Sequence, residues 1–309
     1  MSMSLQPHVT AVERLSFCGD VAAVGAFRCP AGHPLFRDSG PASGYLMVFP
    51  RTSTVIVRDE GSVTAAAPSA MFYNVGQVYT RKQIDPIDSS DWYMVAPDVV
   101  REIVTRHDVT AADRPEQIFS FVTGPVSARI YLAQRKLHTL LSSGEPVDTL
   151  LVEERVIDIL NAVVRDACRV HGRRRTPRRS PIERRLESAK AIIAANLASG
   201  ISLRVLASSV GSSPFQLCRA FHRATGYTIS GYRHALRLRT ALEALRETRM
   251  DLTEIALDLG YSSHSHFTMV FRQHFGVTPS ALRQDRNFDA RSERLLDARP
   301  ALDKIRRLG

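Results

Sequence analysis

Two patterns of hydrophobic and polar positions divide the chain. Between residues 20 and 95, short apolar runs are separated by clusters of Gly, Pro, Asp and Ser, a pattern typical of short strands joined by turns. The runs lie at 21–27, 45–49, 54–57 and 71–73. After residue 97, Leu, Val and Ile recur at spacings of three and four, which predicts helices at 98–107, 125–141 and 147–170.

The last of these helices carries one apolar stripe between about 148 and 169. The stripe consists of Leu151, Val152, Val156, Ile159, Leu160 and Val163. It could pair with the same helix of a second copy or pack on its own chain. We favour pairing, and therefore expect a homodimer.

A further helical pattern occurs twice in the last third of the chain. In each copy a short helix is predicted to end near Gly211 or Gly260, where a left-handed cap needs no Cβ atom. A second helix is predicted to begin at Ser213 in the first copy and at Ser262 or Ser263 in the second, because Ser caps helices. The copies are offset by 49 residues up to the Gly and by 50 after it, so one unit is used twice with one inserted residue.

Each copy is predicted to form a helix-turn-helix, although a single copy fits a simple αα-hairpin as well. Charge supports DNA binding. Residues 1–170 contain 16 Lys and Arg against 19 Asp and Glu, a net charge of −3, whereas residues 171–309 contain 25 against 12, a net charge of +13. A basic domain favours a polyanion, because neutralising phosphates releases condensed counterions. A membrane surface fits less well, because the basic residues interrupt ordinary core helices and do not border a large apolar face.

The stretch from about 183 to 283 resembles the DNA-binding domain of the AraC/XylS family of bacterial transcription regulators. The resemblance rests on spaced residues in both copies. They include Ile201-Ser202-Leu203, Leu206-Ala207, Ser213-Pro214, Thr225-Gly226 and Arg237-Leu238-Arg239 in the first copy, and Ile255-Ala256, Gly260-Tyr261, His266-Phe267, Phe271-Arg272 and Phe275-Gly276-Val277-Thr278-Pro279-Ser280 in the second.

The resemblance implies two helix-turn-helix units joined by a long helix at about 230–248. Their recognition helices, at about 214–224 and 263–274, would enter successive major grooves of double-stranded DNA, roughly 34 Å apart. It also implies RNA polymerase as a partner, and neither a cofactor nor a metal is expected.

Carried over by position, the resemblance implies eight base-contacting residues. They are Phe215, Gln216, Cys218 and Arg219 in the first recognition helix and His264, Ser265, Thr268 and Met269 in the second. Arg219 is the strongest candidate, because a guanidinium can bind both O6 and N7 of guanine for roughly 1–3 kcal/mol of discrimination. Many family members carry Arg where this chain has Met269. The first copy is therefore expected to supply most sequence specificity, and the second mainly affinity.

Other positions in the two copies have alternative roles. Phe215 could contact a thymine methyl group or pack only on the neighbouring turn. His266 stands where the family usually has a packing aromatic, so a core position is favoured over a base contact. Phosphate contacts are expected from Arg204, Arg223, Arg233 and Arg272, with a solvated surface as the alternative for each.

The predicted fold class is α+β with two domains. Residues 1–170 are expected to form a β-rich, cupin-like barrel with a helical hairpin for effector sensing and dimerisation, and residues 182–286 an all-α DNA-binding domain. Residues 171–181 contain five Arg, two Pro and one Gly, which cannot build a core and so form a linker that either follows the phosphate backbone or acts as a solvated spacer. Residues 287–309 form a charged tail.

A small-molecule effector is expected in the barrel. Tyr79 and Arg81 would lie on one face of a strand, since alternate residues point the same way, and they suit an acidic or aromatic molecule. His33 and Phe36 are further candidates, close in sequence to Cys29. A metal at Cys29 and His33 is the less favoured alternative to a structured loop, because residues 1–170 contain no His-x-His cluster.

Composition limits where the protein is expected to act and which other functions fit it. The four Cys show no zinc-type spacing, no segment approaches twenty apolar residues and the start lacks a signal region, so a cytoplasmic protein without membrane contact is expected. One rival is a thiol- or stress-responsive regulator on the same scaffold, which needs an exposed Cys of low pKa such as Cys18 or Cys29. An enzyme is the other rival, but the barrel offers no nucleophile and base. Whether the regulator activates or represses stays open.

Overall fold

The N-terminal part of the chain folds into two antiparallel sheets. The computed structural model describes residues 10–36, 38–39, 41–143, 146–171 and 180–284. The larger sheet has the strand order β1-β2-β9-β4-β7-β10, with β1 (Glu13–Cys18), β2 (Ala22–Pro30), β9 (Ile87–Val95), β4 (Tyr45–Pro50), β7 (Ser69–Tyr73) and β10 (Thr123–Pro125). The smaller sheet has the order β3-β8-β5-β6, with β3 (Asp38–Ser39), β8 (Tyr79–Gln83), β5 (Thr54–Arg58) and β6 (Gly61–Ala65).

These sheets confirm the β-rich N-terminal part, but they do not form a closed barrel. No hydrogen-bonded ladder joins the two sheets within the described residues. The predicted runs at 45–49, 54–57 and 71–73 lie within β4, β5 and β7. The cupin-like barrel expected from the sequence is therefore not confirmed, because the strands form two separate sheets.

Strand β9 lies inside the larger sheet and contributes side chains to a hydrophobic cluster on each of its two faces. It pairs with β2 on one side and with β4 on the other. Trp92 and Met94 pack with the cluster of Phe27 and Phe36 on one face. Tyr93 and Val95 belong to the main core on the opposite face, as strand alternation requires.

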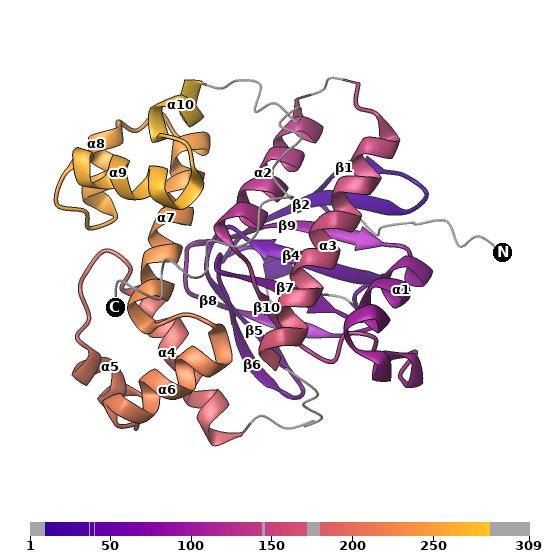
Figure 1. Ribbon diagram of the computed structural model, residues 1–309, viewed down its shortest axis with the longest axis horizontal. Helices are drawn as coiled ribbons and strands as arrows, with labels where there is room; N and C mark the ends of the chain where they lie inside the picture. Colours follow the sequence, from indigo (N-terminus) through magenta and orange to yellow (C-terminus); the bar gives the residue numbers. More distant parts are fainter. Residues whose placement is uncertain (1–9, 37, 40, 144–145, 172–179, 285–309) are drawn as a thin grey trace.

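Helices cover that opposite face (Figure 1). They are α1 (Pro97–His107), α2 (Ala128–Ser142) and α3 (Thr149–His171), with 3-10 turns at Pro34–Phe36 and Val109–Asp113. The stripe on α3 is used within the chain: Val152, Val156, Ile159, Leu160 and Val163 are buried, and α3 packs on α1, α2 and β10. The expectation that this stripe pairs with a second copy is wrong, because its own chain already covers it.

The C-terminal part is entirely helical, as predicted. Its helices are α4 (Pro181–Ala195), α5 (Leu203–Ser209), α6 (Pro214–Thr225), α7 (Ile229–Glu247), α8 (Leu252–Asp258), α9 (His264–Phe275) and α10 (Pro279–Gln284). Figure 1 shows α7 running between one group of helices, α4 to α6, and a second group, α8 to α10. The expected pair of helical units joined by one long helix is confirmed.

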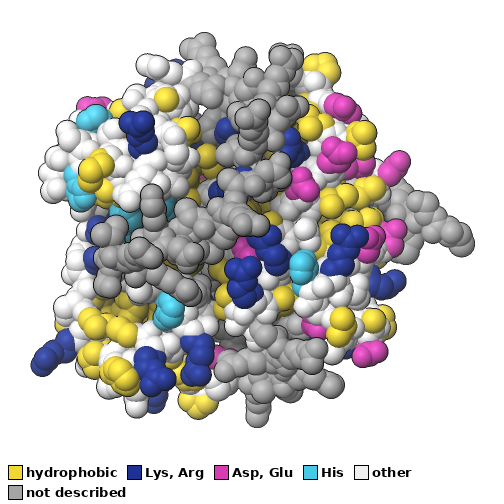
Figure 2. All heavy atoms as spheres, viewed as in Figure 1, with side chains coloured by type: hydrophobic (Ala, Val, Ile, Leu, Met, Phe, Trp, Pro, Cys, Tyr) yellow, Lys and Arg dark blue, Asp and Glu magenta, His cyan; other side chains and the backbone are white. Residues whose placement is uncertain are grey.

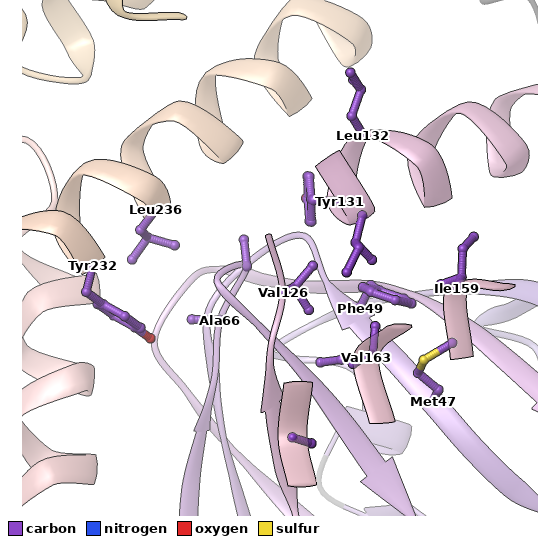
Figure 3. Close-up of a cluster of buried hydrophobic side chains, with 14 of the residues drawn as sticks. Met47, Phe49, Ala66, Val126, Tyr131, Leu132, Ile159, Val163, Tyr232 and Leu236 are labelled. Atoms are coloured by element: carbon purple, nitrogen blue, oxygen red, sulfur yellow. The ribbon is translucent and has the colours of Figure 1, made fainter. Parts of the chain in front are cut away.

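The helical part packs directly on the N-terminal part through α7. Figure 3 shows Tyr232 and Leu236 of α7 extending toward Ala66 and Val126, and all four belong to one continuous buried cluster. The carbonyl of Val126 accepts hydrogen bonds from Tyr227 Oη, at 3.1 Å, and from the guanidinium of Arg239. The two parts of the protein therefore share a core.

Candidate DNA interface and ligand cavity

Local capping sets the ends of the two candidate recognition helices. Ser213 Oγ accepts from the backbone N–H of Gln216 at the start of α6, and Ser263 Oγ accepts from that of His266 at the start of α9. The turn before α6 spans residues 210–213 and the turn before α9 spans 259–263, so the inserted residue of the second copy lies in its turn. Both turns contain a glycine with positive φ, as predicted from the sequence.

Gly260 is required for a second reason, because the first helical unit lies against it. A Cβ atom at Gly260 would lie 2.5 Å from the carbonyl oxygen of Ala198 and 2.9 Å from Nη2 of Arg237. Arg237 in turn donates to the carbonyls of Leu197 and Ala198, which follow α4. The turn of the second unit is therefore packed against the backbone that leads into the first.

Substituting Gly260 with Ala should consequently cost more than the same change at Gly276. Both residues have φ near +77°, at 76° and 78°, so each alanine variant should lose about 1–2 kcal/mol from left-handed backbone strain. Gly276 has open space around it, whereas Gly260→Ala adds a clash that should cost about 1 kcal/mol or more. Urea unfolding of the two variants tests this, and equal losses would contradict the packing argument.

The four candidate base-contacting residues of the first copy all lie on the exposed face of α6. Phe215 is 68% exposed, and Gln216, Cys218 and Arg219 are exposed as well, while Leu217 is buried. The guanidinium of Arg219 lies 5.5 Å from the centre of the Phe215 ring. Phe215 therefore packs on the next turn and still presents most of its surface to solvent, so both roles considered for it fit the geometry.

In the second copy the four candidates share a face of α9 but are less exposed. Met269 is 61% exposed and Ser265 is exposed, whereas His264 and Thr268 are half-buried. These residues line one open hollow together with Arg272, Gln273 and Thr278. Thr268 Oγ1 lies 3.4 Å from His264 Nε2, so part of their polar capacity is directed at each other.

His266 does not take the core position expected for it. Its side chain is exposed, with Nδ1 3.2 Å from Ser262 Oγ and its ring edge-on to Tyr261 at 5.8 Å. Phe267, one residue later, is buried instead. A shift of one position on the helix moves a side chain by about 100°, which is enough to exchange core for surface.

The candidate phosphate contacts also lie at the surface of the helical part. Arg204, Arg223 and Arg272 are exposed, and Arg233 is half-buried. Figure 2 shows basic side chains gathered at the lower left, over α5 and α6. The predicted linker lies mostly outside the described residues, as does the tail 287–309.

A cavity lies between the two sheets of the N-terminal part and opens to solvent. Tyr79 and Arg81, both predicted as ligand contacts, line it. Phe36 does not; it is buried beside Phe27. His33 does not line it either, and its Nδ1 accepts from the backbone N–H of Leu35, which fits a structured loop. Trp92 also lines the cavity and was not predicted, although it begins the apolar run at 92–95, which is a signal for a buried strand.

The cysteines give little support to a thiol sensor. Cys29 is buried, and this burial raises the pKa of its thiol. Burial also raises the pKa of Cys168 to about 11. A thiolate is therefore disfavoured at both residues, since reactive cysteines need a lowered pKa. Cys18 and Cys218 are exposed.

Comparison with known proteins identifies the helical part. Residues 206–285 match a helix-turn-helix domain family. The chain is 36% identical over 86 residues to the probable transcription factor PqrA of Proteus vulgaris, which covers 28% of this chain and 70% of PqrA. It is 39% identical over 83 residues to the regulatory protein SoxS of Escherichia coli, which covers 27% of this chain and 78% of SoxS. The chain belongs to the AraC/XylS family of transcription regulators.

A solved AraC-type transcriptional regulator from Chromobacterium violaceum is 35% identical, covering 34% of this chain and 93% of that chain, with a TM-score of 0.33. The AraC/XylS assignment makes this protein a DNA-binding transcription regulator. Among the helices of the described residues, none is long and apolar enough to cross a membrane.

Between the cavity and the DNA-binding part of this AraC/XylS regulator lies a buried group of charged residues. Asp91 lies on the face of β9 that points away from the cavity. Its carboxylate oxygens lie 2.8 Å from a guanidinium nitrogen of Arg135 and 3.4 Å from nitrogens of both Arg51 and His138. Arg135 also lies 2.9 Å from Glu243 of α7. The interdomain ion network, as we call these five residues, joins the central strand of the sheet to the helix between the two helix-turn-helix units.

Burial and neighbouring charges shift the pKa values of the residues in this network. Burial alone would raise the pKa of Asp91, but the guanidinium groups of Arg135 and Arg51 hold it below its ordinary value. Burial lowers the pKa of His138, which favours its neutral form. Arg135 is thus the cation that lies between two buried carboxylates, those of Asp91 and Glu243. Tyr131 supplies a further donor, because its hydroxyl donates to Glu243 at 2.9 Å.

Proposed function

We propose that this regulator binds specific DNA sequences through α6 and α9 in successive major grooves, under the control of a small molecule held between its two sheets. The observation that carries the first part is the exposed face of α6, where Phe215, Gln216 and Arg219 lie opposite the buried Leu217. A free helix face with an arginine and an amide matches the groups that recognise guanine and adenine in the major groove.

Control by a small molecule is supported by the route from the cavity to α7. Trp92 lines the cavity, and the neighbouring Asp91 belongs to the interdomain ion network. A shift of β9 would therefore change both the cavity and the network. In addition, α3 contacts α6 and α2 contacts α9. Both recognition helices therefore rest on helices of the N-terminal part, and a ligand that moves those helices would alter the spacing of the two units.

The proposal divides the chain into residues 1–170 for effector sensing, a linker at 171–181, a DNA-binding domain at 182–286 and a tail at 287–309. It places the protein in the cytoplasm, without enzymatic activity, and gives it RNA polymerase as a partner, following the family. A homodimer is part of the proposal but needs a surface other than the α3 stripe. Sedimentation of the full chain tests it, and a monomer at micromolar concentration would count against it.

Salt dependence of DNA binding tests the proposed function directly. If the four arginines proposed for phosphates each neutralise one, log affinity should fall linearly with log salt with a slope of about −4. Replacing Arg204 or Arg272 with Gln should reduce the magnitude of the slope by about 1 for every DNA sequence. Arg106→Gln, on the exposed surface of α1, is the matched control and should leave the slope unchanged. A flat salt response of the native protein would reject DNA binding by this surface.

A further inference from the structure

The cavity between the sheets has mostly apolar walls. Leu46, Val48 and Met94 of the larger sheet face Ile56 and Ala65 of the smaller sheet across it. Aromatic rings complete the lining, among them Tyr73, Tyr79 and Trp92. Such a lining with few polar groups is typical of sites for small organic molecules, in which the polar groups fix orientation.

The one arginine in this lining is already neutralised. Arg81 Nε lies 2.7 Å from Asp88 Oδ2, and the side chains of both are less than a tenth exposed, at 8% and 6%. The guanidinium also lies 4.1 Å from the centre of the Phe27 ring and 5.1 Å from that of Tyr79. An acidic ligand would have to displace Asp88 or bring a second carboxylate beside it. An amine would be placed beside Arg81, and the other carboxylate of the lining, that of Glu13, already accepts from the backbone N–H and the hydroxyl of Thr10. Burying either charge without a partner is unfavourable.

Beside the cavity lies a hydrogen-bond donor that lacks a partner within the described residues. Trp92 lines the cavity and is 5% exposed, and its indole Nε1 is buried with no hydrogen-bond partner within the described residues. The ring lies against Gly25, where a Cβ atom would be 2.3 Å from Trp92 Cζ2, so the glycine is what allows the indole this position. A buried N–H without a partner is uncommon, and an acceptor oxygen would satisfy it.

The geometry points to an uncharged ligand of one or two rings that carries a hydrogen-bond acceptor, such as a ketone, for Trp92. This inference rests on the proposed control by a small molecule and revises the acidic ligand that Arg81 by itself suggests. The ring would pack against the apolar walls of the cavity, and the Arg81–Asp88 ion pair would stay intact. The acceptor oxygen would accept a hydrogen bond from the indole N–H of Trp92. Net charge, not ring size, is then the property that the cavity selects against.

Trp92 is the one tryptophan in the chain, so its indole N–H signal in a nitrogen–proton NMR spectrum of the full-length protein reports directly on the cavity. Four probes with the same ring separate the alternatives: 4-ethylacetophenone, 4-ethylbenzoate, 4-ethylbenzylamine and ethylbenzene. We expect the ketone to shift the indole signal saturably, downfield, with a dissociation constant at least about tenfold below those of the two charged probes. Ethylbenzene should bind without the downfield shift.

Two variants make the test sharper. Asp88→Asn should release Arg81 and improve binding of 4-ethylbenzoate about tenfold or more, while Trp92→Phe, followed through the ligand's own NMR signals, should remove the preference for the ketone over ethylbenzene. Tighter binding of benzoate by the native protein, no shift with any probe, or no effect of Asp88→Asn on benzoate would each overturn the inference. Ketone binding that leaves DNA affinity unchanged would instead reject control by this cavity, and a flat salt response would reject only DNA binding.

Discussion

Replacing Arg135 with Met should lower the free energy of unfolding by about 3–5 kcal/mol, because it leaves the carboxylates of Asp91 and Glu243 buried without their shared cation. Arg135→Lys keeps the charge but cannot donate in two directions with a rigid fork, so an intermediate loss is expected. Urea unfolding followed by circular dichroism measures both variants. The loss should exceed that of any single exposed ion pair, because here both partners are out of water.

Arg106→Met is the control for this prediction. Arg106 pairs with Glu102 on the surface of α1, where the two side chains are 63% and 64% exposed, and such pairs contribute at most about 0.5 kcal/mol. In addition, Glu243→Gln combined with Arg135→Met should lose less than the sum of the single losses, since the two residues share one contact. If Arg135→Met cost no more than Arg106→Met, the interdomain ion network would have no structural role.

Replacing Arg219 with Ala should relax base recognition more than Thr268→Ala does. The Arg219 guanidinium is exposed and forms no ion pair with any residue in the described part of the chain, so it is available for guanine. Its loss should remove roughly 1–3 kcal/mol of discrimination at one base pair, or about ten- to a hundredfold in relative affinity. Thr268 is half-buried beside His264 and should contribute less.

A series of binding sites with one base substituted at a time measures this difference. Arg223→Ala is the matched control on the same helix, because loss of a phosphate contact should weaken every site about equally without changing their order. Arg219→Lys should also lose discrimination, since an ammonium group cannot bind guanine in the bidentate way. Equal relaxation by Arg219→Ala and Thr268→Ala would remove the proposed ranking of the two copies.

The two recognition helices could be predicted from the sequence because their capping signals are local, whereas the sequence pattern gave no bounds for α4 and α10. Ser213 before Pro214 and Ser263 before His264 mark the starts of α6 and α9, and the glycines that follow each helix mark their ends. Each of these signals acts within one turn of backbone. For that reason the boundaries expected from the sequence agree with the structure to within one or two residues.

Strand β9 could not be predicted in this way. Its first half contains Asp88, Ser89, Ser90 and Asp91, which resembles a surface turn, yet all four side chains are buried. Asp88 is neutralised by Arg81 of β8, and Asp91 by Arg135, 44 residues further along the chain. Polar residues become core residues here only through partners that the local pattern does not contain.

The α3 stripe shows a second limit of local pattern. Its spacing correctly predicts a buried face, because residues three and four apart lie together on a helix. Spacing contains no information about what covers that face. The cover is supplied by α1, α2 and β10 of the same chain, which come together only when the sheet forms.

The central claim is that two unequal recognition helices determine which DNA this regulator binds. Selection of bound sequences from a random DNA library, run in parallel with the native protein and Arg219→Ala, tests it most directly. Two blocks of constrained bases should emerge about 10–10.5 base pairs apart, one more strongly constrained than the other. In Arg219→Ala the stronger block alone should relax. Two equally constrained blocks, relaxation of the weaker block, or no enriched sequence at all would contradict the claim.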